Sequence, residues 1–210
     1  MDRYRSGTLY DLLSFERSVY RAGRMAAIDL LGLRAGDRVL DLACGTGLSF
    51  APLIDRIGPT GSLVGVDASP QMLARARERV RGGGWHNVRL VLADAGADAG
   101  AALPPPDHRW CDQPVDAVLI SYALSVIPAW QPAWRNALAA LRPGGQAAVV
   151  DLALPHGWAG LLAPLARLAC TAGGSDPWRH PWLLAEREGR EVRRASARGG
   201  HLRVVVARFG

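Results

Sequence analysis

The sequence contains no lysine, few cysteines and no long apolar run. All 25 basic residues are arginine, and the formal net charge is +6. The three cysteines (Cys44, Cys111, Cys170) are far apart and form no Cys-x-x-Cys pair, which argues against a metal site and favours a reducing compartment. No run approaches the roughly 18 apolar residues that a membrane span requires, and residues 1–10 lack the apolar core of a signal peptide. We therefore expect a cytoplasmic protein without bound metal.

The remaining composition is that of an ordinary globular domain. The chain has 210 residues, of which 49% are apolar and 21% charged. A chain of this length fits one domain and buries roughly 70% of its unfolded surface on folding. The modest positive charge permits attraction to an anionic membrane surface but does not require it.

Residues 39–47, Val-Leu-Asp-Leu-Ala-Cys-Gly-Thr-Gly, organise the rest of the chain. The apolar residues suit a strand buried in a parallel sheet. Gly45 and Gly47 allow a tight turn and a close approach by a ligand, which the N–H groups of a following helix would face. Such a strand–turn–helix indicates a nucleotide-type cofactor site. The dinucleotide fingerprint fails, because Phe50 stands where its third glycine is required, and this disfavours an NAD-dependent oxidoreductase.

Strand and helix patterns alternate along the chain. Strands are predicted at residues 38–42, 63–66, 88–92, 115–120 and 146–152, and helices at 8–31, 47–57, from Ser69-Pro70 onward, and at 130–141. Residues 191–197 and 201–209 predict a β-hairpin across a Gly-Gly turn. The pattern therefore predicts an α/β fold with a mostly parallel sheet and an antiparallel C-terminal hairpin.

An aspartate ends the second predicted strand. Asp67 lies 20 residues after Gly47, a register at which a carboxylate can accept both hydroxyls of a ribose. Together with the glycine turn, this spacing predicts a cofactor that contains a nucleoside.

Two motifs resemble those of the class I S-adenosylmethionine-dependent methyltransferases. The first is the acidic residue and Gly-x-Gly turn of residues 41–47, with Ala43 where many members carry a glycine. The second is Leu-Arg-Pro-Gly-Gly at residues 141–145, just before the fifth strand. The resemblance implies a Rossmann-like doubly wound sheet, S-adenosylmethionine as cofactor, and three parts of one domain: an N-terminal helical cap (1–34), a cofactor-binding core (35–152), and a substrate-side helix with the closing hairpin (153–210).

The resemblance also implies a set of cofactor-binding residues at the ends of the first four strands. It places Asp94 on the adenine amino group and Met72 on the adenine ring, although a core methionine is an equal alternative. The full set is Asp41, Ala43, Cys44, Gly45, Thr46, Gly47, Asp67, Ala68, Met72, Asp94, Ala95 and Ser121.

The transferred methyl group is expected beside Ser121 and Tyr122, where the fourth strand ends. The sequence has no Asn/Asp-Pro-Pro-aromatic motif there and no basic run with interleaved aromatics, so a nucleic-acid substrate is not expected. Residues 121–130 and the hairpin resemble bacterial enzymes that methylate lipid head-group amines or other small molecules. We therefore expect a small-molecule or lipid-like acceptor, with an amine as the methylated group and a peripheral membrane contact as an option.

No catalytic dyad stands out in the sequence, which is consistent with an amine acceptor because a neutral amine needs no strong base. Candidates for orienting the acceptor or stabilising developing charge are Tyr122, His156, Tyr10 and Tyr4. Two alternatives stay open: an O- or C-methyltransferase that uses His156 or a tyrosine as base, and a non-catalytic cofactor-binding protein.

Two later segments are ambiguous. Residues 157–172 are strongly apolar and fit either a kinked helix on the sheet or a patch that rests on lipid. Residues 176–182 contain two tryptophans that could line a substrate mouth or anchor a loop. The oligomeric state does not follow from the sequence.

Overall fold

The structure is a computed structural model. It describes residues 20–97, 110–155, 160–161, 163–164, 167, 174–176 and 178–210. The first half of the predicted helix 8–31 and most of the apolar segment 157–172 lie outside the described residues.

Seven strands form one sheet in the order β3-β2-β1-β4-β5-β7-β6. Their bounds are β1 (Arg38–Leu42), β2 (Ser62–Asp67), β3 (Val88–Leu92), β4 (Val115–Ser121), β5 (Leu141–Leu152), β6 (Arg190–Ala197) and β7 (Leu202–Arg208). The first five strands pair in parallel, whereas β7 runs antiparallel to both β5 and β6. The predicted α/β class and mixed sheet are confirmed.

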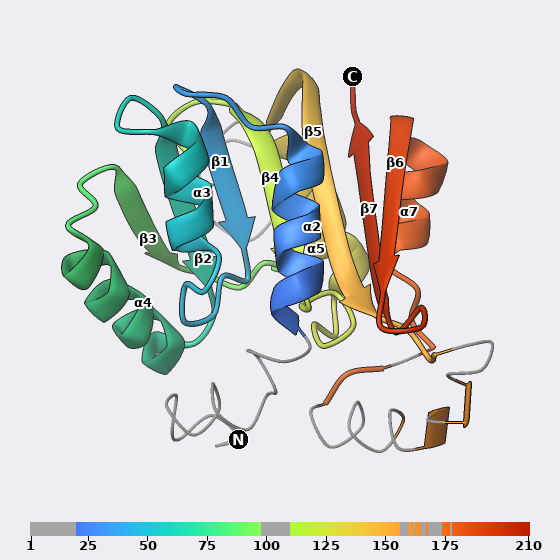
Figure 1. The fold of residues 1–210 in the computed structure, drawn as a ribbon. Helices are drawn as coiled ribbons and strands as arrows, with labels where there is room; N and C mark the ends of the chain where they lie inside the picture. The colour runs from blue at the N-terminus through green and yellow to red at the C-terminus, as the bar shows by residue number, and fades with distance from the viewer. Residues whose placement is uncertain are drawn as a thin grey trace.

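Helices cover both faces of the sheet (Figure 1). One face carries α2 (Arg21–Leu31), α3 (Phe50–Ile57) and α4 (Pro70–Gly83), and the other carries α5 (Trp130–Ala139) and α7 (Trp182–Glu188). Each face has its own apolar cluster. Trp134 of α5 is the largest fully buried side chain among the described residues, and Phe50 and Leu53 of α3 fill the opposite cluster. None of the described helices has the length and apolar character to cross a membrane.

Most predicted elements agree with the structure within a few residues. Helix α3 begins at Phe50 rather than at residue 47, because Gly45 and Gly47 both have positive φ angles that a right-handed helix excludes. Helix α4 begins at Pro70, which agrees with the predicted Ser69-Pro70 start, and Ser69 caps it because its hydroxyl accepts the Met72 N–H at 3.3 Å.

Two features differ from the prediction. Helix α7 was not predicted, because its seven residues are too few to show a helical period. Strand β5 begins at Leu141, ahead of the predicted Pro-Gly-Gly turn and five residues before the predicted start of the strand at residue 146. Val115 of β4 pairs with Leu141 and Ala117 with Gln146, so residues 142–145 bulge out of the ladder and hold the proline and two glycines.

Candidate functional site

The loops that follow β1, β2, β3 and β4 meet at one edge of the sheet, the lower edge in Figure 1. Parallel strands place their carboxyl ends together, so residues far apart in sequence become neighbours there. This edge gathers the predicted cofactor residues of four strand ends: Ala43, Cys44, Gly45, Thr46 and Gly47 after β1, Asp67 and Ala68 after β2, Asp94 and Ala95 after β3, and Ser121 at the end of β4.

The turn after β1 is held by hydrogen bonds to its neighbours. The carboxylate of Asp67 accepts the Gly45 N–H and the Ser69 N–H, each at 2.8 Å. Burial raises the pKa of Asp67, and these two hydrogen bonds oppose the rise. Arg79 of α4 donates to the Thr46 carbonyl at 3.0 Å. Asp67 therefore shapes the turn, and each of its oxygens keeps a second lone pair for a further donor.

The two glycines of this turn have different roles. Gly45 (φ 56°) has no atom within 4 Å of the position that a Cβ would occupy, whereas a Cβ on Gly47 (φ 78°) would collide with the Phe50 ring. Gly47 is thus required by packing. Gly45 opens a cradle that a side chain would fill.

Ala43, which stands where many members of the resembled family carry a glycine, adopts a left-handed conformation with φ 56°. This conformation costs a non-glycine residue on the order of 1 kcal/mol.

We expect Ala43→Gly to raise the free energy of unfolding by up to about 1 kcal/mol, measured by urea denaturation. The relief of steric strain in the folded state should outweigh the chain entropy that glycine adds to the unfolded state. A loss of stability in this variant would show that the alanine methyl contributes packing that outweighs its strain.

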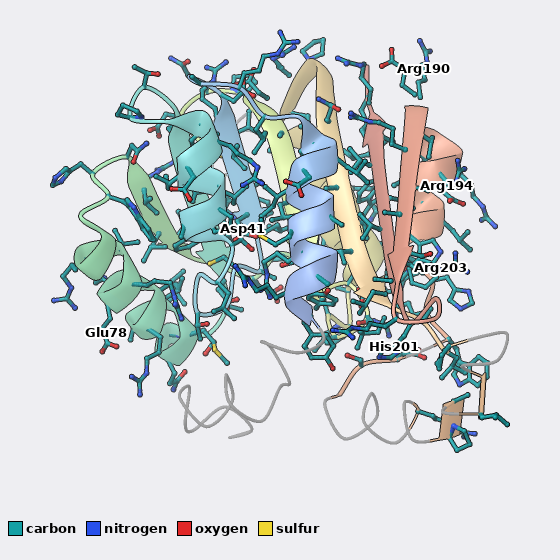
Figure 2. All side chains as sticks on the ribbon, viewed as in Figure 1. Asp41, Glu78, Arg190, Arg194, His201 and Arg203 are labelled. Atoms are coloured by element: carbon teal, nitrogen blue, oxygen red, sulfur yellow. The ribbon has the colours of Figure 1, made fainter. Side chains whose placement is uncertain are left out.

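Asp41 is the most unusual group at this edge. It lies on β1 behind α2 and α3 in the view of Figure 2, and it is 0% exposed. Neither of its carboxylate oxygens accepts a hydrogen bond of good geometry from a described residue, although the Ser49 hydroxyl lies close enough to affect its charge. Burial raises the pKa of Asp41 to about 7; the charge of Arg24 and the Ser49 hydroxyl oppose this rise, and the charge of Asp67 adds to it. A buried carboxylate without donors is costly unless a ligand supplies them.

Arg24 of α2 brings a positive charge to the same place. Its side chain is 7% exposed, and its guanidinium carbon lies 5.9 Å from the centre of the Tyr122 ring. Arginine is almost never buried unless paired, and Asp41 is close enough to feel its charge. Sequence reasoning missed Arg24. The signal that could have found it is its spacing to Ala27, Ile28 and Leu31, which places it on the apolar face of the helix.

The same buried setting affects the cysteine of the turn. Burial raises the pKa of the Cys44 thiol far above its usual range, and the negative charges of Asp41 and Asp67 raise it further. Cys44 is therefore a neutral thiol and can only pack against a ligand.

The residues predicted at the adenine end occupy different environments. Met72 is buried near the start of α4, consistent with either of its two predicted roles. Asp94 is exposed, and its carboxylate accepts the Gly96 N–H at 2.8 Å, which shapes the turn after β3. Ala95 beside it is buried.

Tyr122 follows β4 in a left-handed conformation with φ 56°. Its hydroxyl donates to the Tyr20 carbonyl at 2.7 Å, its N–H donates to the Val150 carbonyl at 2.7 Å, and its ring lies 5.0 Å from the Tyr20 ring. Tyr122 thus connects the end of β4 to the beginning of α2. Its predicted role toward the acceptor stays a prediction. The other three catalytic candidates, Tyr4, Tyr10 and His156, lie outside the described residues.

Tyr122→Phe tests how much of this connection depends on the hydroxyl. We expect the free energy of unfolding to fall by about 1 kcal/mol, the usual net contribution of one hydrogen bond. We also expect turnover to change less than threefold, because the ring and the backbone remain in place. A loss of turnover beyond a hundredfold with unchanged stability would instead assign the hydroxyl to the reaction.

A buried polar cluster lies beneath the end of β4. Asp151 of β5 is fully buried and accepts three hydrogen bonds: from the Ser125 hydroxyl (2.6 Å), the Ser125 N–H (3.0 Å) and the Leu152 N–H (2.8 Å). Burial raises its pKa to about 6, against the effect of these bonds and of the Arg179 charge. Arg179 donates to the carbonyls of Ile127 (2.7 Å) and Leu124 (3.2 Å). This cluster fastens the segment before α7 to the loop after β4.

A cavity of about 280 Å³ lies next to this cluster, at the carboxyl end of β5. Figure 2 shows Arg203 near this end of the β6–β7 hairpin. The described residues that line the cavity are Ala153, Leu154, Trp178, His180, Trp182 and Arg203. Both tryptophans of residues 176–182 line this cavity, and they differ in burial: Trp182 is buried against the core, whereas Trp178 is 62% exposed.

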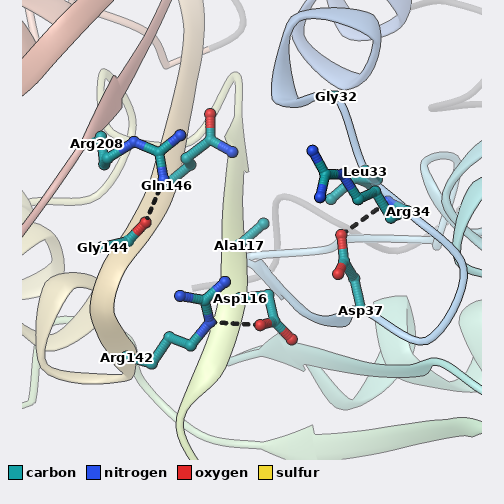
Figure 3. A pocket seen from close by; sticks show the side chains of 10 residues that line it. All are labelled: Gly32, Leu33, Arg34, Asp37, Asp116, Ala117, Arg142, Gly144, Gln146 and Arg208. Carbon is teal, nitrogen blue, oxygen red and sulfur yellow. Dashed lines mark hydrogen bonds and ion pairs between the residues drawn. The ribbon is translucent and has the colours of Figure 1, made fainter.

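A smaller cavity of about 180 Å³ lies at the opposite edge of the sheet (Figure 3). Asp116 accepts the Arg142 Nε–H at 2.5 Å and the Arg38 N–H at 2.8 Å. Burial alone would raise the pKa of Asp116, but these hydrogen bonds and the two arginine charges bring it below its usual value. Arg208 donates to the Gly144 carbonyl at 2.9 Å, so the polar groups here hold the β5 bulge in place.

The order of the strands, with the glycine turn and Asp67 at the carboxyl edge of the sheet, is that of a class I S-adenosylmethionine-dependent methyltransferase. Residues 39–145 match the sequence model of the family described as "Methyltransferase domain", and the chain belongs to this family. Its cofactor is S-adenosylmethionine. Within the part of the chain that the structure describes, no group of histidine, cysteine or acidic side chains could hold a metal ion.

Curated relatives carry names from quinone biosynthesis. The ubiquinone/menaquinone biosynthesis C-methyltransferase UbiE of Pasteurella multocida is 35% identical over 159 residues, which cover 75% of this chain and 53% of that protein. The demethylmenaquinone methyltransferase of Listeria monocytogenes is 34% identical over 137 residues, 64% of this chain and 54% of that protein. The chain thus spans about half the length of the curated relatives it matches. These names fit the C-methylation alternative better than the predicted amine acceptor.

Solved structures share the fold. An S-adenosylmethionine-dependent methyltransferase from Aquifex aeolicus has a TM-score of 0.67 at 17% identity, covering 98% of this chain and 99% of that one. The CurJ carbon methyltransferase has a TM-score of 0.65 at 15% identity, covering 97% of this chain and 58% of that one. At these identities the likeness concerns the fold alone.

Proposed function

We propose that this protein transfers a methyl group from S-adenosylmethionine to a ring carbon of a small hydroxyaryl acceptor. The observation that carries the proposal is the 35% identity to a protein named as a quinone-biosynthesis C-methyltransferase. The cradle after β1, which leaves the Asp41 carboxylate without donors, supports it from the side of the cofactor.

The edge residues match the groups of the cofactor in charge and type. Its amino-acid end carries an ammonium and a carboxylate, which complement the buried Asp41 and Arg24 side chains. The ribose hydroxyls suit the remaining lone pairs of Asp67. Met72 and Asp94 suit the face and the amino group of adenine. Such a binding mode supplies a charged partner to each of the two buried side chains, Asp41 and Arg24.

The cofactor, when bound, supplies a methyl group on a positively charged sulfur. In the proposed reaction an acceptor hydroxyl first gives its proton to water or to a base. A neighbouring ring carbon then donates an electron pair to the methyl carbon, while the pair of the sulfur–carbon bond stays on sulfur. Loss of the proton from that ring carbon restores the aromatic ring. The protein has to hold the two reactants in line and exclude water. His156 or a tyrosine as the base stays a prediction.

The position of the transferred methyl group tests this function. The protein is incubated with methyl-labelled S-adenosylmethionine and matched hydroxyaryl and arylamine acceptors, and products are identified by mass spectrometry and NMR. We expect a new carbon–carbon bond and an unmodified hydroxyl. Transfer to the amine nitrogen alone would overturn the proposal in favour of the amine reading, and binding without any transfer would favour a non-catalytic role.

A peripheral membrane contact is a second part of the proposal. Leu161 (89% exposed) and Trp178 (62% exposed) are large apolar side chains at the surface, and their transfer from water into a lipid interface would be favourable. Co-sedimentation with anionic phosphatidylglycerol vesicles is expected to pellet the protein, and Leu161→Ser with Trp178→Ser to release it. Equal pelleting of the wild type and the double variant would exclude these residues as the contact.

A further inference from the structure

We infer that the cavity at the end of β5 binds the acceptor, and that it selects a flat aromatic ring carrying negative charge. This inference rests on the proposed function and names the substrate class of that site. The cavity joins two tryptophans, a histidine and an arginine, and none of the described residues that line it is acidic.

The location of the cavity suits an acceptor. Ala153 and Leu154 directly follow β5, and β5 is the neighbour of β4, beside whose end the methyl group is expected. The segment that carries the aromatic residues is tied to the loop after β4: the Asp176 N–H donates to the Ser125 carbonyl at 3.0 Å, in addition to the two bonds from Arg179. The cavity wall is therefore held in fixed relation to the end of β4.

The lining residues favour a flat ring. The rings of His180 and Trp182 lie 5.0 Å apart at 34° and form an aromatic wall, and the exposed Trp178 also lines the cavity. Aromatic faces stack on planar ligands and add binding energy beyond the area they bury. A cavity of about 280 Å³ is near the lower end of small-molecule sites, so it suits a head group of one or two rings.

Arg203 supplies the charge selectivity. Among the described lining residues it is the only arginine, and none is acidic. Beside an arginine, an acceptor hydroxyl ionises more readily, because the guanidinium favours the oxyanion. The ionised ring is also the better carbon nucleophile. One residue would thus select the acceptor and promote its reactive form, which fits a sequence without an evident catalytic dyad.

Binding of a matched pair of inert probes tests the inference. Isothermal titration calorimetry on the full chain saturated with S-adenosylhomocysteine compares 2-naphthoate, which is flat and anionic, with 2-naphthamide, which has the same shape and no charge. We expect the wild type to bind naphthoate at least tenfold more tightly. Arg203→Gln should remove this difference, and Arg190→Gln, an exposed arginine on the same hairpin outside the cavity, should preserve it. Trp178→Ala should weaken both probes about threefold to tenfold.

Several outcomes would overturn the inference. They are equal binding of the two probes by the wild type, no binding of naphthoate, or an equal effect of Arg203→Gln and Arg190→Gln. The affinity for S-adenosylhomocysteine is measured in each variant and should change less than twofold. If the affinity for S-adenosylhomocysteine falls in Arg203→Gln, the Trp178→Ala variant becomes the test of the cavity, and unchanged binding of both probes by that variant would overturn the inference. Methyl transfer to ring carbon without naphthoate binding would reject this cavity and leave the proposed function intact.

Discussion

Asp41→Asn is expected to make the ligand-free protein more stable and to make its cofactor binding much weaker. In the unfolded chain an aspartate ionises near 3.8, whereas burial raises the pKa of Asp41 to about 7 in the folded protein. The folded state therefore binds the proton more tightly, and stability falls as the pH rises from about 4 to 7. Above pH 7 the wild type bears the full cost of a buried charge, which the asparagine variant avoids.

The size of this effect follows from the pKa difference. The full shift corresponds to about 4 kcal/mol, from which the cost of burying an unpartnered amide must be subtracted. We expect a gain of about 2 kcal/mol at pH 8, or roughly 4–8 °C in the midpoint of thermal unfolding. The gain should shrink as the pH falls toward 4. A variant less stable than the wild type at pH 8 would contradict the assignment of Asp41 as a strained, ligand-awaiting carboxylate.

Binding should change in the opposite sense. A cofactor ammonium favours ionised Asp41, so wild-type affinity for S-adenosylhomocysteine should fall with decreasing pH below about 7, by up to tenfold per unit. The asparagine variant should bind about a hundredfold more weakly at pH 8 and with little dependence on pH. Calorimetry at pH 6, 7 and 8 measures both. A variant that keeps the wild-type pH profile would assign that titration to another group.

Arg24→Met is expected to weaken binding only for ligands that carry the amino-acid end of the cofactor. Methionine keeps an apolar stem of similar length on the buried face of α2 but removes the charge that complements a carboxylate. We expect the affinity for S-adenosylhomocysteine to fall tenfold to a hundredfold. The affinity for 5′-methylthioadenosine, which lacks the amino acid, should stay within twofold, as measured by the same titration.

Arg21→Met is the matched control, because Arg21 begins the same helix but is exposed. It should leave the affinities for both ligands unchanged. If Arg24→Met weakens both ligands equally, the residue supports the cradle as a whole rather than the amino-acid end. If it weakens neither, Arg24 serves only to offset the charge of Asp41.

The sequence was informative wherever a local pattern has a direct structural cause. Apolar runs that end at Leu42, Asp67 and Ser121 predicted parallel strands, and their shared edge follows from the parallel arrangement alone. The departure at Ala43 was visible as a missing glycine, and the structure gives it a left-handed backbone. These features depend on residues within one strand and one turn.

Other features depend on partners distant in the chain and could not be predicted. Arg24 and Asp41 come from different elements, and only the packing of α2 against β4, β5 and β7 gives their charges a common environment. The acceptor cavity requires residues after β5, before α7 and on β7. The bulge in β5 also escaped prediction, because its Pro-Gly-Gly sequence is equally compatible with an ordinary turn.

The order of the last three strands has a consequence for how the molecule is assembled. Strand β6 is made before β7 but, among the described strands, pairs only with β7, which itself lies between β6 and β5. During synthesis β6 must therefore wait at an unfinished sheet edge until residues 202–208 leave the ribosome. The cofactor-binding half of the sheet, β1 to β5, can form earlier, whereas the side that carries Arg203 is completed last.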